Sequence, residues 1–201
     1  MRIFNNIFVY LTILMIPIFL GMEAKAQDEG VEEIVVTGKA IKESQMAAIE
    51  AKRQAVNVAD IISANGMEAY LFPELRPTPE LSFAVRHHQC QAGIVITASH
   101  NPAEYNGFKV YWSDGGQIVP PIDKKLINQI EKVNFKEINF KGNKSLIKII
   151  DSEIDEAFIE LCLKNGLNKN VHNRDSKIVF TALHGTSSVI MPKLLRRAGY
   201  D

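Results

Sequence analysis

The chain has 201 residues, of which 46% are hydrophobic and 23% are charged. This balance is ordinary for a globular protein and excludes disorder as the default, and the length suits one good-sized domain or two small ones. The 23 basic and 23 acidic residues give no net charge, which removes any general electrostatic case for a nucleic-acid partner. The two cysteines, Cys90 and Cys162, are too few for a disulfide scaffold or a zinc site and are predicted to be buried thiols.

Residues 1–26 have the features of a secretory signal peptide. A basic start precedes an apolar run over residues 7–20, and Ala24-Lys25-Ala26 is a small-x-small site of the kind that signal peptidase cleaves. The run is shorter than the roughly 20 residues of a membrane-spanning helix, and it contains Pro17. The pattern predicts export, with Gln27 as the first mature residue. An uncleaved membrane anchor is the alternative.

Residues 27–65 are acidic and polar at their start, which predicts a disordered or extended segment with weak helical character. Residues 34–37 are four β-branched residues, an exposed edge that can pair with a partner strand. Together with the leader before them and residues 49–63 after them, residues 33–38 resemble the amino terminus of TonB-dependent outer-membrane receptors. The resemblance implies a TonB box at residues 33–38 that pairs with TonB, and a plug-like segment from about residue 45. No barrel follows, because the chain has no room for its many strands.

Beyond residue 65 the sequence alternates apolar strands with amphipathic helices. The run over residues 92–98 is almost continuously apolar, which is typical of a strand that is covered on both faces. Helices between such strands favour an α/β fold with parallel neighbours and a mixed sheet flanked by helices. The periodicity predicts strands at residues 69–72, 92–98, 108–112 and 177–183, and helices at residues 79–88, 121–133, 154–167 and 187–198.

Candidate chemistry follows the strand over residues 92–98. Ligands of open α/β sheets bind beyond the carboxyl ends of the strands. The residues there include Ser99, His100 and Asn101, and Lys109 comes shortly after them. They supply the hydroxyl, imidazole, amide and ammonium groups that can activate a serine nucleophile or stabilise an anion. On spacing alone an ordinary polar turn is the alternative, with Ser99 as a helix cap and Lys109 as a solvated charge.

The stretches at residues 70–87, 93–102 and 105–112 together resemble the α-D-phosphohexomutases, above all bacterial phosphoglucomutase and phosphomannomutase. The resemblance runs from about residue 66 to residue 201. It implies an isomerase of carbohydrate metabolism that moves a phosphoryl group between the 1- and 6-positions of a hexose phosphate through a phosphoserine. It also implies a partial domain I with the phosphoserine loop over residues 66–153, and the start of domain II over residues 154–201.

The resemblance assigns roles to particular residues. Ser99 is implied as the serine that gives the phosphoryl group to a hexose monophosphate and recovers it from the bisphosphate, and its phosphate as a ligand of Mg²⁺. His100 and Lys109 are implied as acid/base or charge-neutralising partners, and glucose 1,6-bisphosphate as the activator. The further candidates for binding substrate or phosphate are Thr97, Asn101, Arg76 and His184. A structural turn role for His184 remains an open alternative.

The resemblance is incomplete at both ends of the chain. Receptor-like sequence takes the place of the family's glycine-arginine segment and first strand, and the family's three-aspartate metal loop, sugar-discriminating loop and fourth domain would lie beyond Asp201. Phosphoryl transfer depends on positioning the substrate, and Mg²⁺ needs several oxygen ligands. We therefore predict that this truncated chain has no measurable mutase turnover on its own.

The two halves imply conflicting locations. The leader implies export to the periplasm or outer membrane, whereas the phosphohexomutases are cytoplasmic enzymes. One explanation is a chimera, that is, a broken or artificially joined reading frame near residues 63–66. The other is a real exported fusion whose strand at residues 34–37 recruits TonB, which would make the chain a binding module rather than an enzyme.

Overall fold

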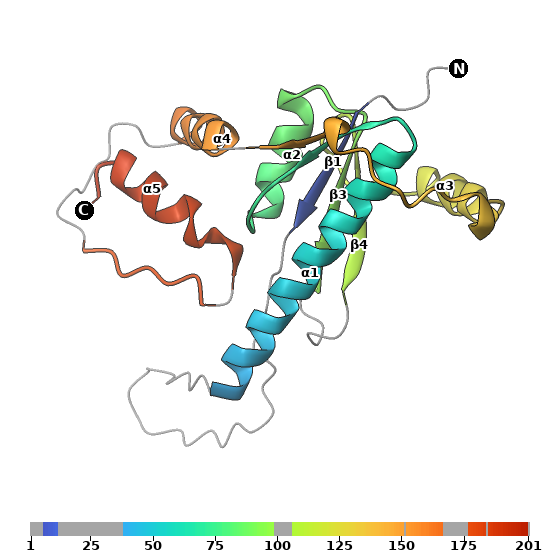
Figure 1. The fold of residues 1–201 in the computed structure, drawn as a ribbon. Helices are drawn as coiled ribbons and strands as arrows, with labels where there is room; N and C mark the ends of the chain where they lie inside the picture. Colours follow the sequence, from blue (N-terminus) through green and yellow to red (C-terminus); the bar gives the residue numbers. More distant parts are fainter. Residues whose placement is uncertain are drawn as a thin grey trace.

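The computed structural model describes residues 6–11, 38–98, 106–150, 152–166, 177–183 and 185–200. The predicted signal peptidase site, residues 33–37 of the predicted TonB box and residues 99–105 of the serine loop lie outside these ranges. The described chain is an α/β protein with helices on both faces of one sheet (Figure 1). This confirms the predicted fold class.

A five-stranded sheet forms the centre of the molecule, in the order β4-β3-β1-β2-β5. The strands are β1 Asn6–Leu11, β2 Glu68–Leu71, β3 Ala92–Thr97, β4 Gly107–Trp112 and β5 Ile147–Ile149. Strand β4 is antiparallel to β3, and the other neighbours are parallel. The carboxyl ends of β1, β2, β3 and β5 therefore share one edge of the sheet. Strands β2, β3 and β4 lie within one residue of their predicted positions.

The central strand β1 comes from the apolar run that sequence analysis assigns to a signal peptide. It pairs with β2 from Asn6 to Val9, and with β3 from Ile7 to Leu11. A strand buried in a parallel sheet needs a continuous apolar run, and so does a leader. The same residues satisfy both patterns, and export remains a prediction. Within the described ranges, none of the helices is long and apolar enough to cross a membrane.

Helix α1, Gly38–Ala64, lies across one face of the sheet (Figure 1). From Gly38 onward the segment is thus helical rather than extended. Its buried residues Ala51, Ala55, Ala59 and Ile62 are three or four apart and form one stripe. The small alanine side chains let the helix pack closely against the sheet. The sheet residues in this cluster are Ala69, Leu71, Ile94 and Ile96.

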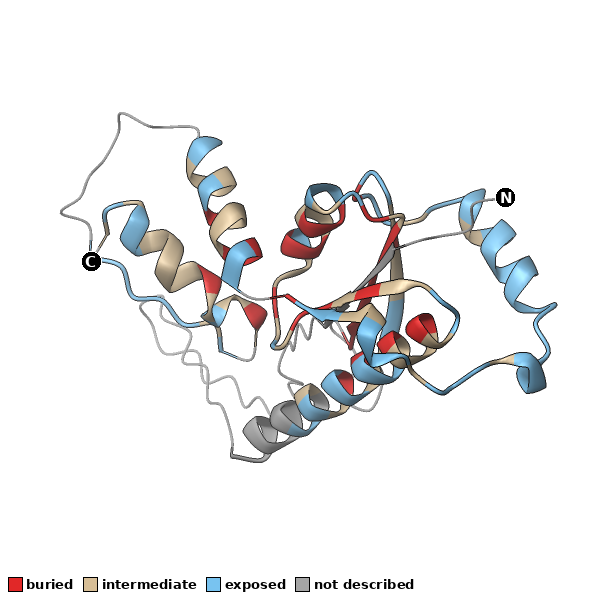
Figure 2. Ribbon diagram, turned by 45° about the horizontal axis from the view of Figure 1, so that its top comes forward, coloured by how far each residue is buried: buried red, intermediate tan, exposed pale blue. Residues whose placement is uncertain are grey.

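Helix α2, Thr78–His87, packs on the opposite face of the sheet. A proline in the first turn suits a helix start, because its missing N–H has no helical partner there. Leu81 and Val85 are completely buried and lie against Gly93 of β3, which has no side chain to separate helix from strand. Figure 2 shows the buried residues gathered on the sheet and on the helix faces that meet it.

The other helices are α3 Ile122–Ile130, α4 Ser152–Lys164 and α5 Ile190–Arg197. Helix α3 has no buried residue and stands away from the sheet (Figures 1 and 2). Helices α4 and α5 pack against each other, and α4 also contacts α2. Short 3₁₀ turns occupy Phe135–Glu137, Lys144–Leu146 and Thr186–Ser188. Gly199, with a φ of +91°, follows α5 as a glycine cap, as the sequence predicts.

The strand predicted at residues 177–183 is wrong. These residues form no strand, and Val179 is 99% exposed. The sequence is apolar enough for a strand, but no neighbouring strand of the described chain pairs with it. Strand β5, which sequence analysis did not find, does pair, from Ala69↔Ile147 to Leu71↔Ile149.

Candidate functional site

The candidate site begins where β3 and β4 hold the two ends of the serine loop. Thr97, the last residue of β3, is buried and is the register partner of Gly107, the first residue of β4. A Cβ on Gly107 would lie 3.0 Å from the Thr97 carbonyl oxygen, so glycine permits this close approach. Ser99, His100 and Asn101 belong to the connection between these ends and lie outside the described residues. Their geometry remains a prediction.

The structure places two of the predicted site residues on one face of the sheet. Val95 is the register partner of Lys109, and Thr97 follows Val95 by two positions. Since side chains alternate along a strand, Thr97 and Lys109 lie on the same face as Val95 and Tyr111, which is the α2 face. Lys109 is partly buried and lies two positions along β4 from Gly107, where β4 begins. Its role in neutralising an anion remains a prediction.

Arg76 has its guanidinium engaged inside the protein. Its Nε donates to Asp155 Oδ1 at 2.7 Å, and its Nη2 donates to Asp155 Oδ2 at 3.0 Å. Its Nη1 donates to the Leu75 carbonyl oxygen at 3.0 Å. A bidentate pair of this kind uses the planar fork that would otherwise bind a phosphate. The geometry favours a structural role for Arg76, and its predicted role in phosphate binding remains untested. His184, the remaining candidate, lies outside the described residues.

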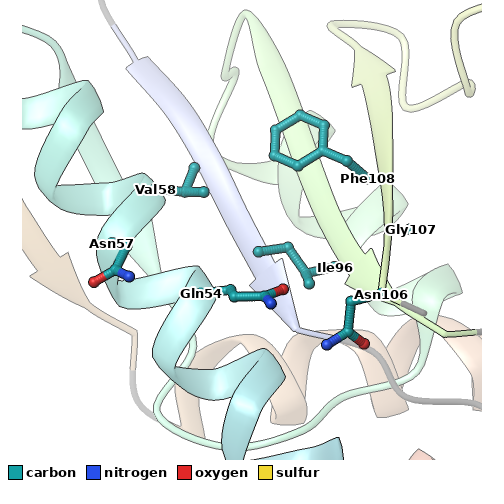
Figure 3. Close-up of a pocket in the computed structure, with 7 residues that line it drawn as sticks. All are labelled: Gln54, Asn57, Val58, Ile96, Asn106, Gly107 and Phe108. Atoms are coloured by element: carbon teal, nitrogen blue, oxygen red, sulfur yellow. The ribbon is translucent and has the colours of Figure 1, made fainter. Parts of the chain in front are cut away.

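A cavity of about 240 Å³ opens between α1 and the ends of β3 and β4 that hold the serine loop (Figure 3). It is lined by Gln54, Asn57, Val58, Ile96, Asn106, Gly107 and Phe108. The polar side chains in this lining are the amides of Gln54, Asn57 and Asn106, and the other lining residues are apolar. The Oδ1 of Asn106 is buried and accepts no hydrogen bond from the described residues, whereas the Nε2 of Gln54 donates to Glu50 Oε1 at 3.0 Å.

Sequence analysis missed Gln54 and Asn57 because they lie in the segment that resembles a receptor. The available signal was their spacing. They lie three residues apart and alternate with the buried alanine stripe of α1, so they share a helix face next to the sheet.

The described residues do not form a magnesium site by themselves. No group of three His, Cys, Asp or Glu side chains in these ranges is arranged to hold a metal ion. Ser99, the one predicted contact to Mg²⁺, is not among them.

Known proteins with similar sequences match the part of the chain that builds this site. Residues 49–137 match the family model for phosphoglucomutase/phosphomannomutase, alpha/beta/alpha domain I. A phosphoglucomutase from Staphylococcus epidermidis is 38% identical over 149 residues, which are 72% of this chain. These similarities support the assignment of the chain to the phosphohexomutase family. A probable phosphomannomutase from Haemophilus influenzae is 36% identical over 146 residues, or 71% of this chain.

A similar fold is present in a solved structure from Thermus thermophilus that is assigned as a phosphomannomutase. It gives a TM-score of 0.64 over 98% of this chain at 22% identity, which shows the fold. The chain spans 27% of the Staphylococcus phosphoglucomutase and 35% of the Thermus protein. The family match begins at residue 49, inside α1 and ahead of residue 66, where the resemblance was expected to begin.

Proposed function

We propose that the chain carries the phosphoserine part of a phosphohexomutase, with Ser99 as the phosphoryl carrier. The observation that supports this most strongly is the domain I match over residues 49–137, because it includes the serine loop. The hairpin that joins Thr97 to Gly107 at the carboxyl edge of the sheet supports it further. The proposed substrate is a hexose phosphate. Domain I, predicted over residues 66–153, would extend back to at least residue 49, where the family match begins, and residues 154–201 would begin domain II.

In the proposed reaction, the phosphoryl group of phospho-Ser99 moves to the free hydroxyl of a hexose monophosphate. The bond from phosphorus to the serine oxygen breaks while the bond to the sugar oxygen forms, which gives the 1,6-bisphosphate. Return of the other phosphoryl group to Ser99 releases the isomer. His100 would take the proton from the attacking hydroxyl, a proton would pass to the released serine oxygen, and Lys109 would neutralise charge on the moving group. Thr97 and Asn101 would help to bind the substrate or its phosphate.

Mg²⁺ is part of the proposal only as an ion that the Ser99 phosphate would help to bind. When bound there, it would add positive charge next to the phosphoryl group.

A direct test is phosphoryl exchange with glucose 1,6-bisphosphate, the proposed activator. The purified chain is incubated with the bisphosphate, and protein-bound phosphate and released glucose monophosphate are both quantified. We expect up to one phosphate per chain in the wild type and none in Ser99→Ala. Equal phosphate uptake by Ser99→Ala would contradict the proposal.

We also propose that the 201-residue chain by itself shows no mutase turnover. The support is that it spans 27% of the Staphylococcus phosphoglucomutase, while phosphoryl transfer needs the substrate held at both ends. The assay uses glucose 1-phosphate with Mg²⁺ and measures glucose 6-phosphate. Turnover that is lost in Ser99→Ala would contradict the inactivity and still support the role of Ser99.

The alternative of an exported module that binds TonB remains a prediction. Residues 33–37 lie outside the described ranges, and residues 49–65 of the predicted plug-like segment fall within the domain I match. A pull-down with TonB that is lost on Val35→Pro would support it, because proline removes a donor from the strand ladder.

A further inference from the structure

Four charged side chains from three parts of the chain meet where α2, α4 and α5 adjoin. Arg76 precedes α2, Glu80 is in the first turn of α2, Asp155 is in the first turn of α4, and Lys193 is on α5. Glu80 is completely buried, Asp155 is 2% exposed and Arg76 is 7% exposed. Lys193 Nζ lies 3.6 Å from Asp155 Oδ2 and remains partly exposed. The cluster therefore joins segments that are far apart in sequence.

Within this cluster, the Asp155 carboxylate accepts hydrogen bonds, whereas the Glu80 carboxyl accepts none from the described residues. Both Asp155 oxygens accept hydrogen bonds from Arg76, at 2.7 and 3.0 Å. Both Glu80 oxygens are buried and accept no hydrogen bond from the described residues. Arg76 Nε lies 3.9 Å from Glu80 Oε1, which is too far for a hydrogen bond, and it already donates to Asp155. An ionised carboxylate without a donor is costly in such a place.

A protonated Glu80 removes this cost, because its O–H can donate to the neighbouring Asp155 carboxylate. Burial first, and then Asp155, raise the pKa of Glu80 to about 9, while Arg76 and Lys193 act in the opposite direction. Cys162 on α4 also faces the cluster, and burial followed by Glu80 raises the pKa of its thiol. When Glu80 is neutral, the positive charge of Arg76 is balanced by the negative charge of Asp155.

We propose that Glu80 is a neutral carboxylic acid whose O–H donates a hydrogen bond to Asp155, and that this hydrogen bond together with the Arg76–Asp155 pair holds α4 against α2. Helix α4 also carries Glu156 and Glu160, which pair with Arg197 of α5. This junction acts together with the buried Ile154 and the Phe83–Phe158 ring contact to hold the α4–α5 pair on α2, and ionisation of Glu80 weakens it. The proposal is independent of phosphoryl transfer.

The sign of the pH effect follows from the direction of the Glu80 pKa shift. The unfolded chain releases this proton near the ordinary value of 4.5, whereas the folded chain keeps it up to about pH 9. Between these values the folded state binds one more proton, so stability falls as the pH rises. The unfolding equilibrium constant then rises by up to about tenfold per pH unit from this group.

The test is urea unfolding of the full chain and of Glu80→Gln between pH 5.5 and 8.5. Glutamine has the shape and the donor of a protonated glutamate but does not titrate. We expect the ratio of the wild-type unfolding constant to that of Glu80→Gln to rise with pH over this range. The matched control is Glu131→Gln at the exposed end of α3, for which this ratio should stay constant. A constant ratio for Glu80→Gln would overturn the proposal.

A second measurement applies if Glu80→Gln fails to fold. The infrared spectrum of the wild-type chain should retain the C=O stretch of a protonated carboxyl group at pH 7, and this band should disappear above about pH 9. Hydrogen exchange gives the structural result. The amides of α4 should lose protection relative to those of β3 between pH 7 and 9. Absence of the infrared band at pH 7 would overturn the proposal, as would equal changes in α4 and β3.

Discussion

Substitution of Gly93 by alanine should force helix α2 away from the sheet. The new Cβ would lie 2.6 Å from Val85 Cγ2 and 3.3 Å from both Leu81 Cδ atoms. Both neighbours are completely buried, so they cannot move without displacing the helix or creating strain. Overpacking of this kind costs about 1–3 kcal/mol, and replacing glycine within a strand returns about 0.5–1 kcal/mol. We expect a net loss of about 1–2 kcal/mol.

The assay is urea unfolding followed by the fluorescence of Trp112, the single tryptophan, for Gly93→Ala, Val85→Ala and the double variant. Val85→Ala should cost less in the Gly93→Ala background, with a coupling energy of about 1 kcal/mol, because it removes the clashing methyl group. Gly166→Ala is the control, since its Cβ would come no closer than 3.4 Å to the Leu163 carbonyl oxygen. Strictly additive effects would refute the packing argument.

Three further predictions concern the sheet centre, the thiols and the buried ion pair. Removal of residues 1–26 deletes β1, so far-UV circular dichroism should show no cooperative unfolding; a cooperative transition as in the full chain would contradict the central position of β1. Burial raises the pKa of Cys90 to about 12, so a disulfide reagent at pH 8 should modify the half-buried Cys162 first and leave Cys90 unmodified until urea is added. Rapid modification of Cys90 in a Cys162→Ser chain would contradict its burial. Asp155→Ala removes the two hydrogen bonds that the buried Arg76 donates to this carboxylate and should cost about 3–5 kcal/mol in urea unfolding; a cost below about 1 kcal/mol would contradict the burial of this ion pair.

Local patterns predicted the elements that build the serine-loop hairpin. The continuous apolar run of β3 and the proline-marked start of α2 are signals within a few residues. The same holds for β4, whose bounds differ from the prediction by one residue. The family resemblance then predicted the phosphoserine role of the loop between β3 and β4.

Elements that depend on distant partners were not predictable in the same way. The apolar run of β1 fits a leader as well as a buried strand, and only pairing with β2 and β3 distinguishes them. The buried alanines of α1 were not recognised as a core-facing stripe because the residues around them are mostly polar. Residues 177–183 have a strand pattern without a partner strand among the described residues.

The buried cluster of Arg76, Glu80, Asp155 and Lys193 also depends on residues that are distant in the sequence. Strands β3, β4 and β5 lie between Glu80 and Asp155 in the sequence. Each of the two residues resembles an ordinary acidic residue in the first turn of a helix. Their burial depends on how α4 packs against α2. The periodicity of the sequence does not predict such a contact between two helices, so this junction could be found only in the folded structure.

The central claim is that Ser99 is the residue that carries the phosphoryl group. Peptide mapping by mass spectrometry of the chain after incubation with glucose 1,6-bisphosphate tests it most directly. The account predicts phosphate on Ser99 alone. Phosphate on another residue, or a chain that takes up none, would contradict the account.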